Sequence, residues 1–116
     1  MTDIQIRSKI WLEVNGQPFL GGGRLKLLRA IAATGSINAA SQQLGISYRK
    51  AWSQLQEMEK HGIPLVEREK GGSGGGRSVI TPQARELLSK FDDVQKGLHR
   101  IIDDKFDRVF NPDKTD

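Results

Sequence analysis

Cysteine is absent from this sequence of 116 residues, and no hydrophobic run in it is long enough for a signal peptide or a membrane span. The first absence excludes a disulfide framework and thiolate chemistry, and the second leads us to expect a cytoplasmic protein with no membrane contact. Hydrophobic residues make up only 36% of the chain and aromatic residues 6%. We therefore expect one small domain with one core, which needs a partner to bury its remaining apolar surface.

Groups suited to catalysis or metal binding are also scarce. The two histidines, His61 and His99, lie far apart in the sequence, and no HxxxH-type pair is present. No two residues suggest a general acid and a general base. The sequence therefore predicts a protein that is not an enzyme, with no metal and no cofactor.

Positive charge is concentrated in the first two thirds of the chain. Residues 1–80 contain 11 Lys and Arg against 6 Asp and Glu, a net charge of +5, whereas residues 81–116 contain 7 against 8, a net charge of −1. This asymmetry favours a polyanionic partner for the first part and a protein partner for the second.

Residues 35–62, GSINAASQQLGISYRKAWSQLQEMEKHG, have the pattern of two short helices joined by a tight turn. Ser36 is placed to cap the first helix, and Gly45 can adopt the left-handed conformation that ends it. Ser47 is placed to start the second helix. A short helix, a turn with glycine and a second helix are typical of a helix-turn-helix, whose second helix enters a DNA major groove.

The second helix has one apolar face and one polar face. At 100° per residue, the positions expected to pack inward are Tyr48, Ala51, Trp52, Leu55 and Met58. The positions expected to face solvent are Arg49, Lys50, Ser53, Glu57 and Lys60. We interpret Arg49, Lys50, Ser53 and Gln54 as DNA contacts, while a solvated helical hairpin with no ligand remains the alternative.

Two further elements precede this stretch. Alternating apolar residues over positions 4–14, followed by Asn15-Gly16, predict a strand and a reversing turn of a β-hairpin. The second strand should be short, because Pro18 and the glycines at positions 21–23 cannot continue it. Residues 24–34 should then form a helix. Its expected inward positions are Leu25, Leu28, Ile31 and Ala32, with Gly35 at its end.

A strand, a glycine-rich loop and a returning strand are predicted after Gly62, which describes the wing of a winged helix. Lys70, Ser73 and Arg77 are the expected phosphate contacts of this wing. A plain flexible linker is one alternative. A nucleotide-binding loop is another, because residues 71–78 fit its spacing, but Arg77 replaces the required lysine and no helix follows directly.

The last element is predicted to be a long helix from Pro82 to about Phe110, with Thr81 as its N-cap. An apolar stripe along it consists of Leu87, Phe91, Val94, Leu98 and Ile101. A small domain cannot cover a stripe of this length, so we expect the helix to pack against its twin in a homodimer. Folding back along its own core is the alternative.

These segments together resemble a known family. The run GRLKLLRAIAATGSINAASQQLGISYRKAWSQLQEME, then PLVERE, a glycine-rich loop and VITPQARELL, is similar to the N-terminal DNA-binding domain of ModE-type molybdate-responsive regulators. That domain is similar in turn to the winged helix-turn-helix of LysR-type regulators. The resemblance covers about residues 6–96.

The resemblance implies a mainly α fold with small β elements: a winged helix-turn-helix with an N-terminal β-hairpin and a long C-terminal dimerisation helix. Residues 1–81 would be the DNA-binding domain, residues 82–110 the dimerisation helix and residues 111–116 a polar tail. The recognition helix would open at Ser47 and Tyr48, and both residues are expected DNA contacts.

The expected function is that of a transcriptional regulator that binds an inverted-repeat operator in double-stranded DNA as a homodimer. The molybdate-binding region of ModE-type regulators has no counterpart in these 116 residues. We therefore expect no molybdate site in them, and a separate effector-binding protein is one alternative. A winged-helix adaptor that binds another protein and never DNA is the competing function.

Overall fold

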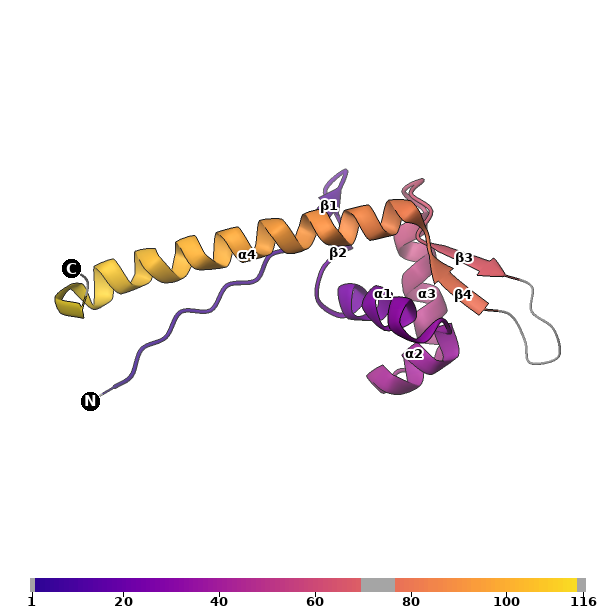
Figure 1. Ribbon diagram of the computed structural model, residues 1–116, viewed down its shortest axis with the longest axis horizontal. Coiled ribbons are helices and arrows are strands. Elements are labelled where there is room, and N and C mark those ends of the chain that lie inside the picture. The colour runs from indigo at the N-terminus through magenta and orange to yellow at the C-terminus, as the bar shows by residue number, and fades with distance from the viewer. Residues whose placement is uncertain (1, 70–76, 115–116) are drawn as a thin grey trace. The chain divides into compact units, whose positions relative to one another are not determined.

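The computed structural model describes residues 2–69 and 77–114. These residues form two compact units, one consisting of Trp11–Leu88 and the other of residues 2–10 together with residues 89–114. The elements follow one another in the order β1 (Leu12–Val14), β2 (Gln17–Leu20), α1 (Gly22–Thr34), α2 (Ile37–Leu44), α3 (Tyr48–Glu59), β3 (Val66–Glu69), β4 (Arg77–Ile80), α4 (Pro82–Phe110) and η1 (Pro112–Lys114) (Figure 1). The winged helix-turn-helix predicted from the sequence is confirmed as the fold class.

The N-terminal hairpin is present but shorter than predicted. Asn15 and Gly16 both have positive φ, 51° and 76°, as the central residues of a tight hairpin turn require. Strand β1 begins only at Leu12, whereas the alternation predicted a strand from Ile4. The reason is that β2 ends at Leu20, so residues 4–10 have no strand to pair with inside this hairpin.

Helix α1 is buried over a wider arc than the sequence pattern indicated. Leu25, Leu28 and Ile31 are buried as predicted, but Ala32 is exposed. Leu27 and Ala30 are buried instead. Because α1 contacts α2, α3 and β4, it is covered from more than one side and needs more than one apolar stripe.

Local capping fixes the helix-turn-helix as predicted. The Ser36 hydroxyl accepts a hydrogen bond from the Ala39 N–H at 3.0 Å, and the Ser47 hydroxyl accepts one from the Lys50 N–H at 3.0 Å. Between them, Gly45 ends α2 with a φ of 70°. Helix α3 therefore starts at a defined residue and a defined angle to α2.

The inner face of α3 is narrower than predicted. Ala51, Leu55 and Met58 are fully buried, in a core that also contains Leu20, Leu27, Leu28, Ile31 and Leu65. Tyr48 is exposed and Trp52 is only half-buried, so the expected inward arc is wrong at these two positions. Both aromatic side chains lie on the flank of the helix, where they contact Arg68 of β3.

The base of the wing is tied to the helices by hydrogen bonds to its backbone. The carboxylate of Glu59, at the end of α3, accepts hydrogen bonds from the Leu65 N–H at 2.8 Å and the Val66 N–H at 3.3 Å. The Ser78 N–H donates to the Gly35 carbonyl at 2.9 Å. Strands β3 and β4 pair antiparallel, with Arg68 opposite Ser78. The wing strands are thus held at both the end of α3 and the turn before α2.

Thr81 joins the wing to α4 and supports a first prediction. Its buried hydroxyl donates to the Pro64 carbonyl at 2.7 Å and accepts from the Ala84 N–H at 3.0 Å. Thr81→Val should lower the free energy of unfolding by about 1–2 kcal/mol, because an N-cap and a buried hydrogen bond are lost together. Urea denaturation measures this change. Thr81→Ser, which keeps the hydroxyl, is the control, and equal stability of the two variants would contradict the assigned role.

Helix α4 starts after Thr81 and ends at Phe110, as predicted. Along its apolar stripe, Leu87 is half-buried and Phe91 is only 1% exposed, whereas Val94, Leu98 and Ile101 are 48%, 40% and 62% exposed. The stripe therefore divides into a covered N-terminal part and an open remainder. In the part of the chain that the structure describes, no helix is long and apolar enough to cross a membrane.

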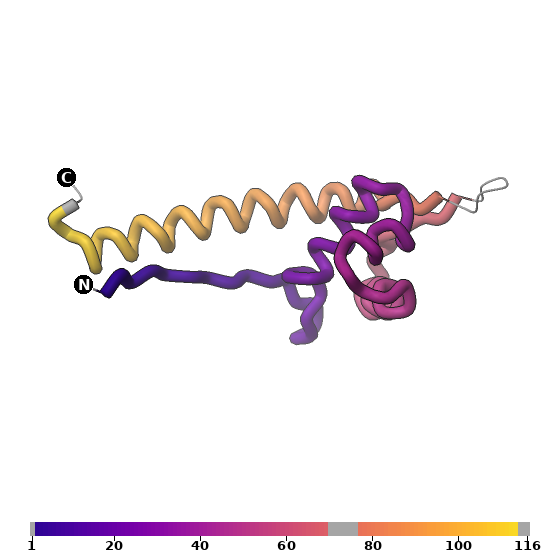
Figure 2. The backbone as a smooth tube through the Cα atoms, turned by 90° about the horizontal axis from the view of Figure 1, so that it is seen from below, coloured from indigo at the N-terminus to yellow at the C-terminus, as the bar shows by residue number. Residues whose placement is uncertain are grey.

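Within its own unit, the second half of α4 is accompanied by the N-terminal segment (Figure 2). The Ser8 hydroxyl and His99 Nδ1 lie 2.6 Å apart, in hydrogen-bonding contact. Further along, Ile4 and Ile6 line a groove together with Phe106 and Phe110, whose rings stack 4.5 Å apart. Residues 4–10, predicted as a strand, thus run beside a helix.

Candidate nucleic-acid interface

The outward face of α3 has the residues expected there. Arg49, Lys50 and Ser53 are all exposed, in the first two turns of the helix. Because a helix N-terminus carries a partial positive charge, these cations add to a field that is already favourable to phosphate. The first two turns of α3 are therefore the most electropositive part of this helix.

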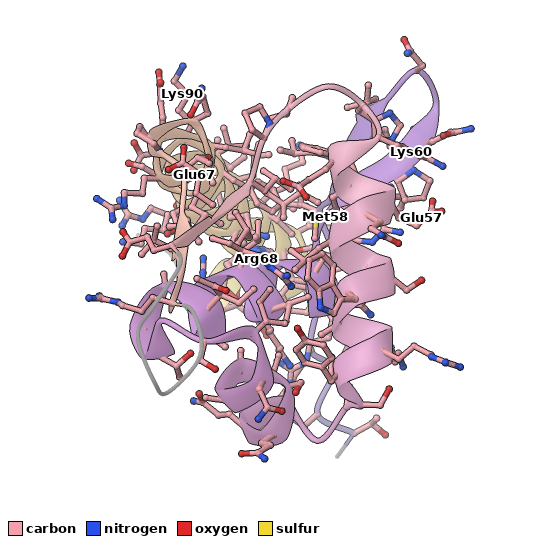
Figure 3. The ribbon with its side chains drawn as sticks, turned by 90° about the vertical axis from the view of Figure 1, so that its right-hand side faces the viewer. Glu57, Met58, Lys60, Glu67, Arg68 and Lys90 are labelled. Carbon is pink, nitrogen blue, oxygen red and sulfur yellow. The ribbon has the colours of Figure 1, made fainter. Side chains whose placement is uncertain are left out.

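The C-terminal end of the same face is neutralised. Glu57 and Lys60 form an ion pair of 2.8 Å on the side of α3 that faces away from Arg68 (Figure 3). The hydrogen bond from Lys60 lowers the pKa of the Glu57 carboxyl below its ordinary value, because it favours the charged form. The net positive charge of α3 thus lies at the start of the helix.

Two of the predicted contact residues have environments that the sequence did not indicate. The Ser47 oxygen accepts the capping hydrogen bond, which uses one of its two lone pairs and holds the side chain against the helix N-terminus. Gln54 is half-buried, and its side-chain carbonyl oxygen is buried without a hydrogen-bond partner among residues 2–69 and 77–114. Gln54 thus lies at the border of the exposed face rather than on it.

An aromatic and cationic cluster lies where α3 faces β3. The guanidinium carbon of Arg68 lies 3.8 Å from the centroid of the Trp52 ring, and its Nη2 donates to the Tyr48 hydroxyl at 3.2 Å. The Tyr48 and Trp52 rings meet edge to face at 6.2 Å. Hydrogen bonding from Trp52 and from Arg68 lowers the pKa of the Tyr48 phenol from its ordinary value. The cluster holds Arg68 in one orientation beside the start of α3 (Figure 3).

A pocket of about 180 Å³ lies next to this cluster. It is lined by Ser36, Ile37, Asn38, Tyr48, Arg68, Arg77 and Ser78. Arg77 is the predicted wing contact that the structure describes, and its Nε packs close to Gly35, within 3.6 Å of the position a Cβ there would take. Lys70 and Ser73, the other predicted wing contacts, lie outside the described residues.

Sequence reasoning missed Asn38 and Arg68 as members of this site. A usable signal for Arg68 was the alternation in PLVERE, which places Val66 and Arg68 on one face of β3. In the structure, the residues paired with them, Ile80 and Ser78, are buried. Asn38 carried no comparable signal, since an exposed residue in the first turn of a helix is common. Among the residues that the structure describes, no group of three or more His, Cys, Asp or Glu is placed to hold a metal ion.

Known proteins match the part of the chain that contains the helix-turn-helix and the wing strands. Residues 23–85 match the family of bacterial regulatory helix-turn-helix proteins of the lysR type. The DNA-binding transcriptional dual regulator ModE of Escherichia coli K12 is 36% identical over 105 residues, which are 87% of this chain and 40% of that protein. The transcriptional regulator ModE of Haemophilus influenzae is 38% identical over 79 residues, 67% of this chain and 31% of that protein.

A third relative is the molybdenum-pterin-binding protein MopB of Rhodobacter capsulatus, 34% identical over 98 residues, which are 84% of this chain and 36% of that protein. The chain therefore spans less than half the length of these curated relatives.

Proposed function

Because the chain belongs to the ModE-type regulators with a LysR-type helix-turn-helix, we propose that it is a sequence-specific DNA-binding transcriptional regulator acting in the cytoplasm. The observation that carries this proposal is the first two turns of α3, where Arg49, Lys50 and Ser53 are exposed at a capped, electropositive helix end. A helix with these properties suits the major groove, where arginine and lysine reach guanine and hydroxyl groups reach several bases.

The proposed contacts fall on two elements. On α3 they are Ser47, Tyr48, Arg49, Lys50 and Ser53, with Gln54 at the edge of the surface. On the wing they are Lys70, Ser73 and Arg77. In this arrangement α3 supplies base contacts and the wing holds the sugar–phosphate backbone, which positions the helix.

We further propose that the regulator binds an inverted-repeat operator as a homodimer. One recognition helix and one wing give too few contacts for specificity in a genome, so two copies on half-sites roughly 10 base pairs apart are expected. The exposed side chains of Val94, Leu98 and Ile101 on α4 support this proposal, because they offer an apolar surface at coiled-coil spacing.

We assign no effector to these 116 residues. The name of the R. capsulatus relative refers to molybdenum–pterin binding by that protein, and the aligned segment covers 36% of it. In our proposal the part described here binds DNA, and an effector acts through a separate protein or region.

The proposed function is tested by fluorescence polarisation with duplexes selected from a random pool. We expect a single preferred motif with two-fold symmetry, and an affinity that falls steeply as salt rises, because bound cations release counterions from DNA. If no duplex is bound above background even at low salt, a protein-binding adaptor becomes the better reading of the same surface.

A further inference from the structure

The pocket beside the recognition helix combines groups from three elements. Arg68 and Arg77 come from the two strands of the wing, Tyr48 from the first turn of α3 and Asn38 from the first turn of α2. Its lining residues include two arginines and no aspartate or glutamate. Glu67 and Glu69 flank Arg68 in sequence but lie on the other face of β3, because side chains alternate along a strand, and Glu69 is the cross-strand partner of Arg77.

The contacts of Arg68 fix its orientation and leave hydrogen-bond donors for a ligand. A guanidinium has five N–H donors, and one of them goes to the Tyr48 hydroxyl. Stacking on Trp52 fixes the guanidinium plane, which lowers the entropy lost when a second group binds. Arg68 remains exposed, so a bulky ligand can reach its remaining donors.

The start of α2 adds backbone donors to the same pocket. Ser36 caps this helix by accepting from the Ala39 N–H. The N–H groups of Ile37 and Asn38 are in the first turn, where no carbonyl of the helix can accept from them, and both residues line the pocket. Two arginines, a phenol hydroxyl and the positive end of a helix dipole together match a tetrahedral anion.

We infer that this pocket binds one phosphate group of the DNA backbone, between Arg68, Arg77 and the start of α2. The inference rests on the proposed DNA binding and adds a specific anchoring site to it. The anchor is on the same first turn of α3 as the residues proposed to read bases, since Tyr48 is followed directly by Arg49 and Lys50. A phosphate held here sets which base pair those side chains reach.

Arg68→Gln is the first test, measured by fluorescence polarisation on the selected operator across a range of salt. Affinity should fall by roughly tenfold and the salt slope by about one, equally for all sequences, because one charge-assisted phosphate contact is lost. Arg29→Gln removes the same charge from the exposed side of α1 and is the matched control. Thermal unfolding confirms that each variant is folded, and Arg77→Gln, which leaves the Trp52 stack intact, replaces Arg68→Gln if that variant fails to fold.

Single methylphosphonate substitutions along the operator locate the phosphate itself. Removing the charge of the anchored phosphate should weaken wild-type binding, and should have no further effect on Arg68→Gln. A parallel titration with inorganic phosphate, followed through the amide NMR signals of Ile37 and Asn38, distinguishes a free anion. Saturable binding of inorganic phosphate with no coupled backbone position would overturn the inference.

DNA binding by the protein and phosphate binding by this pocket are tested by separate results. A wild-type protein that binds no DNA contradicts the proposed function. A wild-type protein that binds its operator, while Arg68→Gln and Arg77→Gln keep the wild-type affinity and salt slope, contradicts the phosphate site alone.

Discussion

Val94→Asp combined with Leu98→Asp should yield a folded monomer whose affinity for a full operator falls to that for a half-site. Both residues are 40–48% exposed near the middle of α4, so neither is part of the core of the single chain. In a dimer each of them would be buried, contributing about 1.5–3 kcal/mol before entropic costs are subtracted. Buried, unpaired carboxylates would oppose association strongly. Analytical ultracentrifugation at micromolar concentration measures the change.

The matched control is Lys96→Ala with Arg100→Ala. It changes the net charge by the same amount at exposed positions on the other side of α4 and should leave the dimer intact. An unchanged dimer in the aspartate variant, or a wild type that is monomeric at micromolar concentration, argues against α4 as the interface. The N-terminal region, where Ile4 and Ile6 are exposed, is then the next candidate.

The burial of Phe91 refines the proposed dimer interface. Together with Leu87 it was expected to face a second copy, but it is covered already in the single chain. A substitution at Phe91 would therefore disturb the fold of each subunit and could not report on association. The three exposed positions that follow on the stripe are the informative ones.

The parts of the fold that the sequence predicted well are those decided by neighbouring residues. Ser36, Gly45 and Ser47 act on backbone groups a few positions away, so their roles can be read from the chain alone. The Asn15-Gly16 turn is of the same kind, because asparagine tolerates positive φ and glycine, which has no Cβ, adopts it freely. Such local signals set where α2 starts and stops and where α3 starts.

The errors concern contacts between segments distant in sequence. Alternation over residues 4–14 predicted one strand, but pairing depends on a partner strand, and β2 reaches only Leu12. Periodicity placed Trp52 inward, yet the arginine that stacks on it comes from β3. Neither the stack nor the pocket beside it could be derived from the helical period, which describes one element at a time.

The exposed face of α3 is also smaller than the helical period predicted. Arg49, Lys50 and Ser53 are exposed, as their helical positions require, whereas Gln54 lies at the border beside buried Met58. Lys60 shares the outward face, but its pairing with Glu57 removes it from consideration as a free cation. The face that the sequence outlined is thus narrowed to the first two turns of α3.

Within those turns, Arg49→Ala and Lys50→Ala should have different effects on DNA binding. A planar guanidinium can donate two hydrogen bonds to a guanine edge, whereas an ammonium acts mainly as a point charge on phosphate. Arg49→Ala should therefore cost about 1–3 kcal/mol of binding free energy and relax preference at one base pair. Lys50→Ala should weaken binding to all sequences alike and reduce the salt slope by about one.

Selection of duplexes from a random pool by each variant, with polarisation measured at several salt concentrations, separates these outcomes. Lys60→Ala is the control, because it removes the same charge from the same helix at a position already compensated by Glu57, and it should change the affinity least. Arg49 would lose its assigned role if its alanine variant kept the wild-type motif and lost affinity only through the salt slope. In that case Lys50, or Ser53 one turn further on, would have to read the base, and the register of α3 in the groove would be displaced accordingly.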